Sequence, residues 1–353
     1  MTGIAYNVEG RAVWDNVMAR FGGSGLDDIY FDHRYASLYA RQNKIPRAFV
    51  YEDGEALFFL PMIISPIEGG GNVQWYDFET VYGYSGPICR AGDVEFLTAA
   101  WQAFDAYCRS NRIVAGLFRF NPLIENHALA EAYPGVEVML DRQTVYLDLD
   151  KEYRTVWDEY ASDNRNRIRK AEKLGITLET KNDLSALRTF SDLYHGRMEE
   201  LEADENYFFG AEYFEKIMDL GTERFRVLLA KAGGEVVGGA ILLLSARFVH
   251  YHLSSTPRRY QKYAANNFLR DAAIKTFLGQ GREKILFGGG RTAAADDSLL
   301  RFKERFSKTH LPFYIGRYVG DAAAYDGIRQ EWKRNHPEMV AAYGNRVLCY
   351  RYV

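Results

Sequence analysis

Two carboxylates lie two residues apart in an aromatic tract that is suited to the floor of a binding cleft. Asp77 and Glu79 alternate with aromatic residues in the segment YDFETVYGYSGP, residues 76–87. Alternate residues of a β-strand point to the same face, so this spacing predicts that both carboxylates share one side. Such a carboxylate can take a proton from a substrate. If the segment is only a strand leading to a Gly-Pro turn, both acids are simply solvated. Glu79 is the first candidate for a catalytic base.

A second polar segment contains two histidines. In FVHYHLSSTPRRYQKYAANNF, residues 248–268, His250 and His252 fall on one face of a predicted strand and Tyr251 on the other. A pair at this spacing suits a general base or two metal ligands, but a metal needs a third ligand and none is spaced nearby. We therefore predict no metal. His252 is the second candidate base, with a structural histidine as the alternative.

The same segment continues into a basic loop. Arg258, Arg259 and Lys262 precede the small residues 264–265, and a helix is predicted to begin at residue 266 or 267. Free backbone N–H groups and the helix dipole at a helix N-terminus favour an anion. A strand, a basic loop and a helix start in this order predict a phosphate-binding site.

A third segment, LFGGGRTAAADDSLLRFKERF at residues 286–306, combines a glycine turn with a lysine. Three glycines after a strand permit a tight turn and the close approach of a ligand. Arg305, late in the following helix, is typical of a cation that complements the helix dipole. Lys303 lies between Phe302 and Phe306, which favours a more specific role for its amino group.

The elements that position these residues occur twice. Residues 48–65 and 225–245 each form a predicted β-hairpin, around Asp53-Gly54 and Gly233-Gly234 respectively. After each hairpin come an aromatic-rich stretch, a helix and a short strand. This repetition predicts two similar α/β lobes with a ligand-binding cleft between them; a chance recurrence of common elements is the alternative. The predicted boundaries are 1–150, 151–320 and a C-terminal helix and strand over 321–353. One long helix is expected over residues 156–174, ending at Gly175, and a last strand over residues 346–353.

Composition sets limits on the partners. The 353 residues carry a formal net charge of −3, so no overall field attracts DNA or an anionic membrane, although a local basic patch is compatible with this value. Cys89, Cys108 and Cys349 are odd in number and widely spaced, which is typical of reduced thiols. No apolar leader and no stretch of about 18 apolar residues is present. We expect a soluble, cytoplasmic protein without a membrane span.

Several motifs together resemble the FemABX-related branch of the GNAT acyltransferase superfamily. They are the tract ETVYGYSGP, the helix end at residues 165–175 (RNRIRKAEKLG), the Asn-Asn-Phe-Leu transition at 266–269, the LFGGG turn, and Phe-Lys-Glu-Arg-Phe at 302–306. Each motif is loose, but their order is specific, and they span residues 79–306. The resemblance implies an α/β (α+β) fold of two tandem GNAT-like units, each a mixed, splayed sheet flanked by helices.

The resemblance also assigns sites. The first lobe would hold the amine acceptor through Glu79 and the substrate-binding residues Asp77, Tyr82, Gly83, Tyr84 and Gly86. The second lobe would hold the acyl donor through Arg258, Arg259, Lys262, Ala264, Asn266, Asn267 and Gly289. Lys303 would neutralise a phosphate or the developing oxyanion. The C-terminal strand would return to the first lobe. The chain departs from the family where its loop lacks glycine at residues 261–266 and where some members carry a long helical-hairpin insertion.

These inferences lead to one main hypothesis and two rivals. The main hypothesis is an N-acyltransferase that moves an acyl group, with acyl-CoA as the expected donor, to an amine of a cell-envelope or polysaccharide precursor. Direct attack by the amine fits the absence of a G-x-S-x-G motif. In this hypothesis Tyr82 and the catalytic candidate Tyr251 donate to a leaving thiolate or a sugar hydroxyl. The first rival is tRNA-dependent aminoacyl transfer onto a peptidoglycan precursor, for which the basic residues 165–173 and 258–262 are the candidate track. The second rival is a non-catalytic ligand-binding protein.

Overall fold

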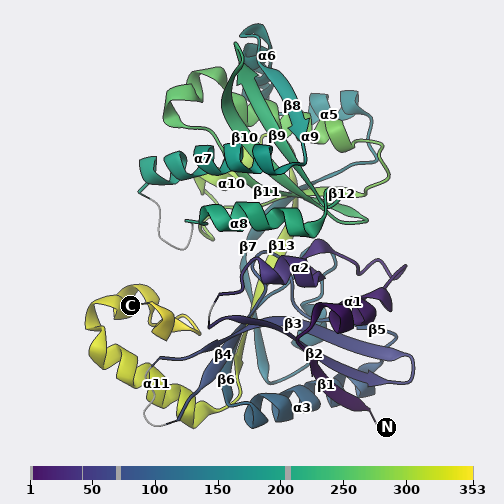
Figure 1. Cartoon of the computed structure of the whole chain (residues 1–353), viewed down its shortest axis with the longest axis vertical. Helices are drawn as coiled ribbons and strands as arrows, with labels where there is room; N and C mark the ends of the chain where they lie inside the picture. Colours follow the sequence, from purple (N-terminus) through teal and green to yellow (C-terminus); the bar gives the residue numbers. More distant parts are fainter. Residues whose placement is uncertain (1–2, 42, 69–72, 203–207, 353) are drawn as a thin grey trace. The chain divides into compact units, whose positions relative to one another are not determined.

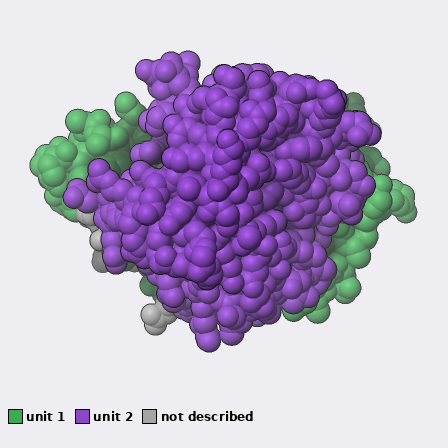
Figure 2. Space-filling model, turned by 90° about the horizontal axis from the view of Figure 1, so that it is seen from above, with its two compact units in different colours: residues 1–141, 312–353 green, residues 142–311 purple. Residues whose placement is uncertain are grey.

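The computed structural model describes residues 3–41, 43–68, 73–202 and 208–352. The chain forms two compact units, residues 1–141 with 312–353 (unit 1) and residues 142–311 (unit 2), which Figures 1 and 2 show. The divisions fall inside strands β7 (Val136–Asp148) and β13 (Thr309–Val319), so each of these strands supplies residues to both units. The expected boundaries at 150/151 and 320/321 lie just beyond the ends of the same two strands.

Unit 1 is a mixed sheet with helices packed against it. Its strand order is β1-β2-β3-β4-β6-β13, with β4 and β6 parallel and the other neighbours antiparallel. The elements are β1 (Ile4–Val8), α1 (Arg11–Ala19), α2 (His33–Ser37), β2 (Ile45–Asp53), β3 (Ala56–Pro66), β4 (Tyr76–Thr80), β5 (Ile88–Arg90), α3 (Val94–Ser110), β6 (Ile113–Arg119), α4 (Ala128–Glu131), α11 (Ala322–Asn335) and α12 (Val340–Tyr343). Helix α3, capped by Asp93, buries Trp101 and Phe104 against the sheet.

Unit 2 repeats this plan. Its strand order is β8-β9-β10-β11-β12-β7, and β11 and β12 are parallel. The elements are α5 (Tyr153–Glu159), α6 (Ser162–Lys173), β8 (Thr177–Lys181), α7 (Leu184–Glu200), α8 (Ala211–Lys216), β9 (Phe225–Ala232), β10 (Glu235–Leu244), β11 (Phe248–Ser255), α9 (Ala265–Phe277), β12 (Lys284–Gly289) and α10 (Ser298–Lys303). Helices cover both faces of β10, because Gly238 approaches Ala265 of α9 whereas Gly239 approaches Phe190 of α7.

The two units therefore share one topology, as the repeated sequence pattern predicted. An antiparallel hairpin is followed by a third antiparallel strand, then a helix, then a strand parallel to the third. Gly54 at the first hairpin turn and Gly233 and Gly234 at the second adopt positive φ angles of 58°, 57° and 89°, as tight hairpin turns require. The expected fold class is confirmed: an α/β fold of two mixed sheets with flanking helices.

Two predicted elements are wrong. Residues 156–174 form two helices rather than one, because the backbone is extended at Tyr160 and Ala161, where the Tyr160 hydroxyl donates to the Asp271 carboxylate at 3.1 Å and Ala161 N–H donates to the Arg305 carbonyl at 3.0 Å. The predicted strand at residues 346–353 is, over its described part, a 3₁₀ turn at Cys349–Arg351. Val347 and Leu348 pack beside Trp332 of α11, which uses their apolar side chains without strand pairing.

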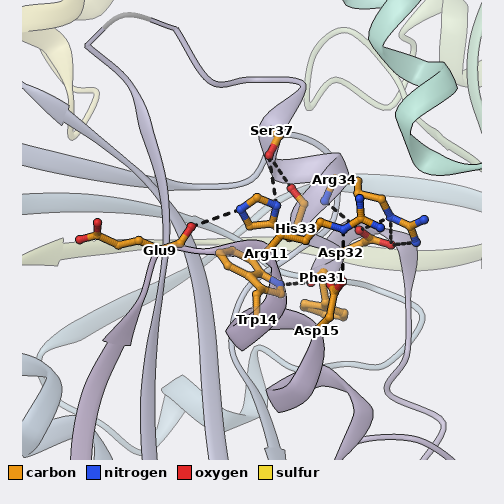
Figure 3. A network of polar contacts seen from close by, with 9 residues as sticks. All are labelled: Glu9, Arg11, Trp14, Asp15, Phe31, Asp32, His33, Arg34 and Ser37. Atoms are coloured by element: carbon orange, nitrogen blue, oxygen red, sulfur yellow. Dashed lines mark hydrogen bonds and ion pairs between the residues drawn. The ribbon is translucent and has the colours of Figure 1, made fainter.

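Helices α1 and α2 are joined by polar contacts at the N-terminal side of unit 1, shown in Figure 3. The Asp32 carboxylate accepts a hydrogen bond from Arg34 N–H at 2.8 Å and so caps α2. The Trp14 indole N–H donates to the Phe31 carbonyl at 2.8 Å, and the His33 ring packs edge-on against Trp14. Across the described part of the chain, no helix combines the length and the apolar composition that a membrane crossing needs.

Candidate functional site

The parallel strands β11 and β12 of unit 2 pair over a short stretch and then separate. Their register runs from Phe248 opposite Lys284 to His250 opposite Leu286 and stops there, although both strands continue. Each strand bulges beside this point, β11 at His252 against β10 and β12 at Phe287 against β7. A bulge redirects a strand and ends its pairing. The splayed sheet expected for this unit is therefore present, and the candidate residue His252 lies at the β11 bulge beside the split.

The His252 ring is held at the β11 bulge in a neutral form. Its Nε2 lies 2.6 Å from the Tyr213 hydroxyl. Burial, together with the neighbouring His250, lowers the pKa of His252 to about 3. A base of such low pKa removes a proton from an ammonium group poorly. The geometry thus disfavours His252 as the catalytic base, and its prediction as a catalytic residue gains no support.

The predicted phosphate-binding loop ends in a left-handed residue just before α9, although no glycine stands there to predict it. Ala264 precedes α9 in the left-handed region, with φ +54° and ψ +34°, and no described side chain caps the helix. This conformation favours glycine, yet alanine stands at this position. Arg258, Arg259 and Lys262 are all exposed around this helix start. The arrangement can bind a phosphate group through first-turn N–H groups and exposed cations.

The two asparagines of this segment have structural roles. The Asn266 side-chain oxygen accepts from the Thr256 hydroxyl at 2.9 Å, and the Asn267 amide donates to the Asn164 side chain at 2.8 Å. These bonds tie the start of α9 to the end of β11 and to α6. Since both side chains point into the protein, any contribution of Asn266 and Asn267 to a ligand would come from their backbone N–H groups.

The glycine turn at the end of β12, residues 288–290, accepts hydrogen bonds from two basic side chains. The Lys303 amino group donates to the Gly289 carbonyl at 2.6 Å, and the Arg142 guanidinium donates to the Gly290 carbonyl at 2.8 Å. A Cβ atom at Gly289 would lie 2.8 Å from Arg142 Cδ, so this position is confined to glycine by packing. Burial, with the positive charges of Arg270 and Arg142, lowers the pKa of Lys303 to about 7. Lys303 can therefore exchange a proton near neutral pH.

In unit 1 the two predicted carboxylates do share one side of β4, and each is paired with an arginine. Asp77 is fully buried and forms a two-point ion pair with Arg351, while Glu79 accepts from Arg119 at 2.6 Å. Burial alone would raise the pKa of Glu79, but Arg119, Arg351 and Lys44 lower it overall. An ionised, paired carboxylate of low pKa is a weak base. Sequence reasoning did not identify the three cations, since they are distant in the chain.

The tract 82–86 is committed largely to internal packing. A Cβ atom on Gly83 would lie 2.3 Å from the Tyr30 ring, and one on Gly86 would lie 2.9 Å from the Asn126 amide. The close approach that these glycines allow is thus made by protein side chains. The Tyr84 ring packs edge-on against Tyr30 and Phe313. Tyr82 is 38% exposed and is the side chain of this tract best placed to meet a ligand.

Residues 159–304 match the family model described as an acetyltransferase (GNAT) domain. The structure of FemX has a TM-score of 0.68 to this chain at 14% identity, covering 93% of this chain and 100% of that one. A search of curated protein sequences gives no match.

Two further solved structures share the fold. The structure of L-PGS from Bacillus licheniformis has a TM-score of 0.56 at 16% identity, with 87% of this chain and 92% of that chain covered. A tandem GNAT protein from the clavulanic acid biosynthesis pathway has a TM-score of 0.51 at 13% identity, with 90% and 99% covered. The domain match and these shared folds confirm the resemblance seen in the sequence: the chain contains a GNAT domain within a FemX-like, tandem fold.

Proposed function

We propose that this chain, as a FemX-like protein with a GNAT domain at residues 159–304, is an N-acyltransferase that moves an acyl group from an activated donor to an amine. The observation that carries the proposal is the start of α9. Left-handed Ala264 opens a helix with no described side-chain cap, and exposed cations flank it. Backbone N–H groups so presented bind phosphate, and acyl-CoA is an activated acyl donor that carries phosphates.

The acceptor in this proposal is an amine of a cell-envelope or polysaccharide precursor. Support comes from the fold, since one structure with this architecture is that of a putative lysylphosphatidylglycerol synthetase domain from Agrobacterium fabrum, at a TM-score of 0.51 and 15% identity over 88% of this chain and 93% of that one. Its name specifies lysylphosphatidylglycerol, an aminoacylated phospholipid, so this likeness supports an envelope precursor as acceptor. The amine follows from the proposed N-acyl transfer alone, because phosphatidylglycerol offers a hydroxyl group.

Transfer requires a neutral amine, a proton acceptor and stabilisation of the tetrahedral oxyanion. Because the Glu79 carboxylate is paired with Arg119 and His252 is neutral with a very low pKa, neither is a strong base. In the proposal, most of the rate enhancement comes from positioning the two substrates against each other. A water molecule accepts the proton that the amine loses. Lys303, with a pKa of about 7 and its amino group on the Gly289 carbonyl, supplies positive charge beside the split strands.

Calorimetry with CoA and acetyl-CoA tests the donor. We expect binding by the wild type and a roughly tenfold or greater loss of affinity in Arg258→Ala/Arg259→Ala, since each removes a charge from the phosphate site. The matched control is Arg167→Ala/Lys170→Ala on the exposed face of α6, which should bind CoA normally. Equal affinity of wild type and the Arg258/Arg259 variant would contradict the assignment of the phosphate site.

A second candidate is aminoacyl transfer from tRNA, favoured by the exposed cations of α6, namely Arg167, Arg169, Lys170 and Lys173. Aminoacyl-tRNA binding that weakens steeply with salt and is lost in Arg167→Ala/Lys170→Ala, with no binding of CoA, would replace the CoA proposal. A non-catalytic ligand-binding protein would bind in either assay but show no turnover with any amine, and its binding would be indifferent to Lys303→Ala.

A further inference from the structure

A buried arginine that no sequence pattern predicted lies at the point where β11 and β12 separate. Arg270, on α9, is 3% exposed. Its guanidinium carbon is 4.3 Å from the Tyr251 ring centroid of β11 and 5.4 Å from the Phe287 ring centroid of β12. The rings of Tyr251 and Phe287 are themselves 6.1 Å apart. The guanidinium therefore stands beside the split, next to one side chain from each of the two diverging strands.

Aromatic rings form the rest of its surroundings. Phe302 and Phe306, from α10 and the turn after it, lie 4.9 Å and 5.4 Å from the guanidinium carbon. Tyr251, Phe287 and Phe306 are buried, whereas Phe302 is half-buried. These four rings form an aromatic cage around the Arg270 guanidinium, and the cage is nearest to solvent at Phe302. Cation–π contacts of this kind contribute about 0.5–2 kcal/mol each, which is small compared with the cost of burying an unpaired charge.

The guanidinium has no anionic partner among the described residues. Its Nε and Nη1 atoms are buried and make no hydrogen bond to any described group. The adjacent carboxylate of Asp271 is engaged elsewhere, by the hydroxyls of Tyr153 and Tyr160 and by Lys275 at 2.8 Å. Buried polar groups are normally satisfied, so two buried nitrogen atoms of one guanidinium without an acceptor call for an acceptor from outside the described residues.

The neighbouring charges increase this deficit. Lys303 is 8% exposed and donates to the Gly289 carbonyl, and Arg142 donates to the Gly290 carbonyl of the same turn. The nearby acid is Asp297, whose carboxylate accepts hydrogen bonds from the backbone N–H groups of residues 291, 292, 299 and 300. Asp297 is therefore already occupied at the start of α10 and does not compensate the charge of Arg270.

We infer that Arg270 is an anion-binding residue at the strand split and that it receives a carboxylate of a substrate. A guanidinium matches a carboxylate in shape and charge and can donate two hydrogen bonds to it. The phosphates of a donor belong to a separate place, the start of α9, because Arg270 lies five residues further along the helix, about 7.5 Å at 1.5 Å per residue. Resting on the proposed acyl transfer, this site selects an acyl group or an amine acceptor that carries a carboxylate close to the reacting centre.

The first test follows thermal unfolding of the full chain with sodium acetate, sodium succinate and inorganic phosphate. We compare the wild type, Arg270→Met, Arg270→Lys and the control Arg188→Met, an exposed residue of α7. Carboxylates should raise Tm of the wild type and of Arg188→Met, and should raise that of Arg270→Met little or not at all. Loss of the charged hydrogen bonds predicts a roughly tenfold to hundredfold fall in affinity. An equal rise in Arg270→Met, or a rise with phosphate alone, would overturn the carboxylate site.

If Arg270→Met fails to fold, an NMR titration of the wild-type protein still tests the carboxylate site. The ¹⁵Nε–H signal of a buried arginine can be followed by NMR and assigned with Arg270→Lys. A shift of this signal on titration with succinate supports the site, whereas an unchanged signal contradicts it.

The source of the carboxylate is distinguished by comparing succinyl-CoA with acetyl-CoA. Tighter binding of succinyl-CoA that disappears in Arg270→Met places the carboxylate on the donor. Equal binding of the two CoA esters, with protection by free carboxylates, places it on the acceptor. Protection by carboxylates without any CoA binding would remove the proposed donor while leaving the Arg270 site intact, so the two proposals fail separately.

Discussion

Arg351, near the C-terminus, forms a two-point ion pair with Asp77, which is fully buried on β4, across 274 residues of sequence. The Arg351 Nε atom donates to Asp77 Oδ2 at 2.8 Å, and the second contact joins Nη2 to Oδ1. Burial raises the pKa of Asp77 to about 6 even though Arg351 opposes the shift. The pair therefore fixes the C-terminal segment to the sheet of unit 1 and makes the stability of that unit sensitive to pH.

Arg351→Met should destabilise the protein by about 3–5 kcal/mol at pH 8, because it leaves a buried carboxylate without its partner. The loss should be smaller at pH 5. A carboxyl group whose pKa is raised in the folded state favours folding below that pKa, and this contribution is lost as pH rises through it. Urea unfolding at pH 5 and pH 8 measures both values. The double variant Asp77→Asn/Arg351→Met is the control and should recover part of the loss at pH 8; a cost independent of pH would contradict the role of Asp77.

The parts of the fold that sequence predicted are those set by local chemistry. The hairpins follow from Asp53-Gly54 and Gly233-Gly234, whose backbone freedom acts within a few residues. The single helix predicted over 156–174 failed because the hydrogen bond that opens it joins Tyr160 to Asp271, 111 residues away. Local pattern contains no information about such a partner.

The same limit applies to the candidate site. Because Asp77 and Glu79 are two residues apart in a strand, the sequence predicted that both lie on one side of it. Their arginine partners, 274 and 40 residues away, could not be predicted in this way. The loop before α9 was recognised by its cations, whereas its left-handed residue was hidden because alanine stands there. Arg270 was missed altogether, since an arginine inside a helix ordinarily reads as a solvated side chain.

Gly83→Ala should lower the stability of the protein by about 2–4 kcal/mol. The residue has φ +98°, which an L-residue rarely adopts, and the new methyl group would meet the buried Tyr30 ring at 2.3 Å. Gly196→Ala is the matched control, because Gly196 lies inside α7 with open space at its Cβ position. It should stabilise the protein by about 0.5–1 kcal/mol. Chemical unfolding of both variants provides the comparison; a neutral Gly83→Ala would show that Tyr30 yields readily.

Ala264→Gly should stabilise the protein by about 0.5–1 kcal/mol. Glycine removes the cost of the left-handed conformation, and part of the gain is offset by the greater freedom of glycine in the unfolded chain. Thermal and urea unfolding measure the change. Ala264→Val is the opposing variant, because a β-branched residue tolerates this region worse than alanine. If valine is accepted without loss, the loop has a different backbone from the one described.

Lys303→Met should abolish a rise in stability that the wild type shows between pH 7 and pH 9. Burial lowers the pKa of Lys303 to about 7 in the folded protein, whereas the unfolded chain keeps the ordinary value of 10.5. Between these values the unfolded state binds more protons, so the free energy of unfolding increases with pH by up to about 1.4 kcal/mol per unit. Because other groups titrate in both proteins, the decisive quantity is the difference between wild type and variant in urea unfolding at each pH. Lys308→Met, an exposed lysine on the same segment, should retain the wild-type slope. Equal slopes for the wild type and Lys303→Met would mean that the amino group stays charged in the folded protein, and the neutral-pH proton exchange assigned to it beside the strand split would then be wrong.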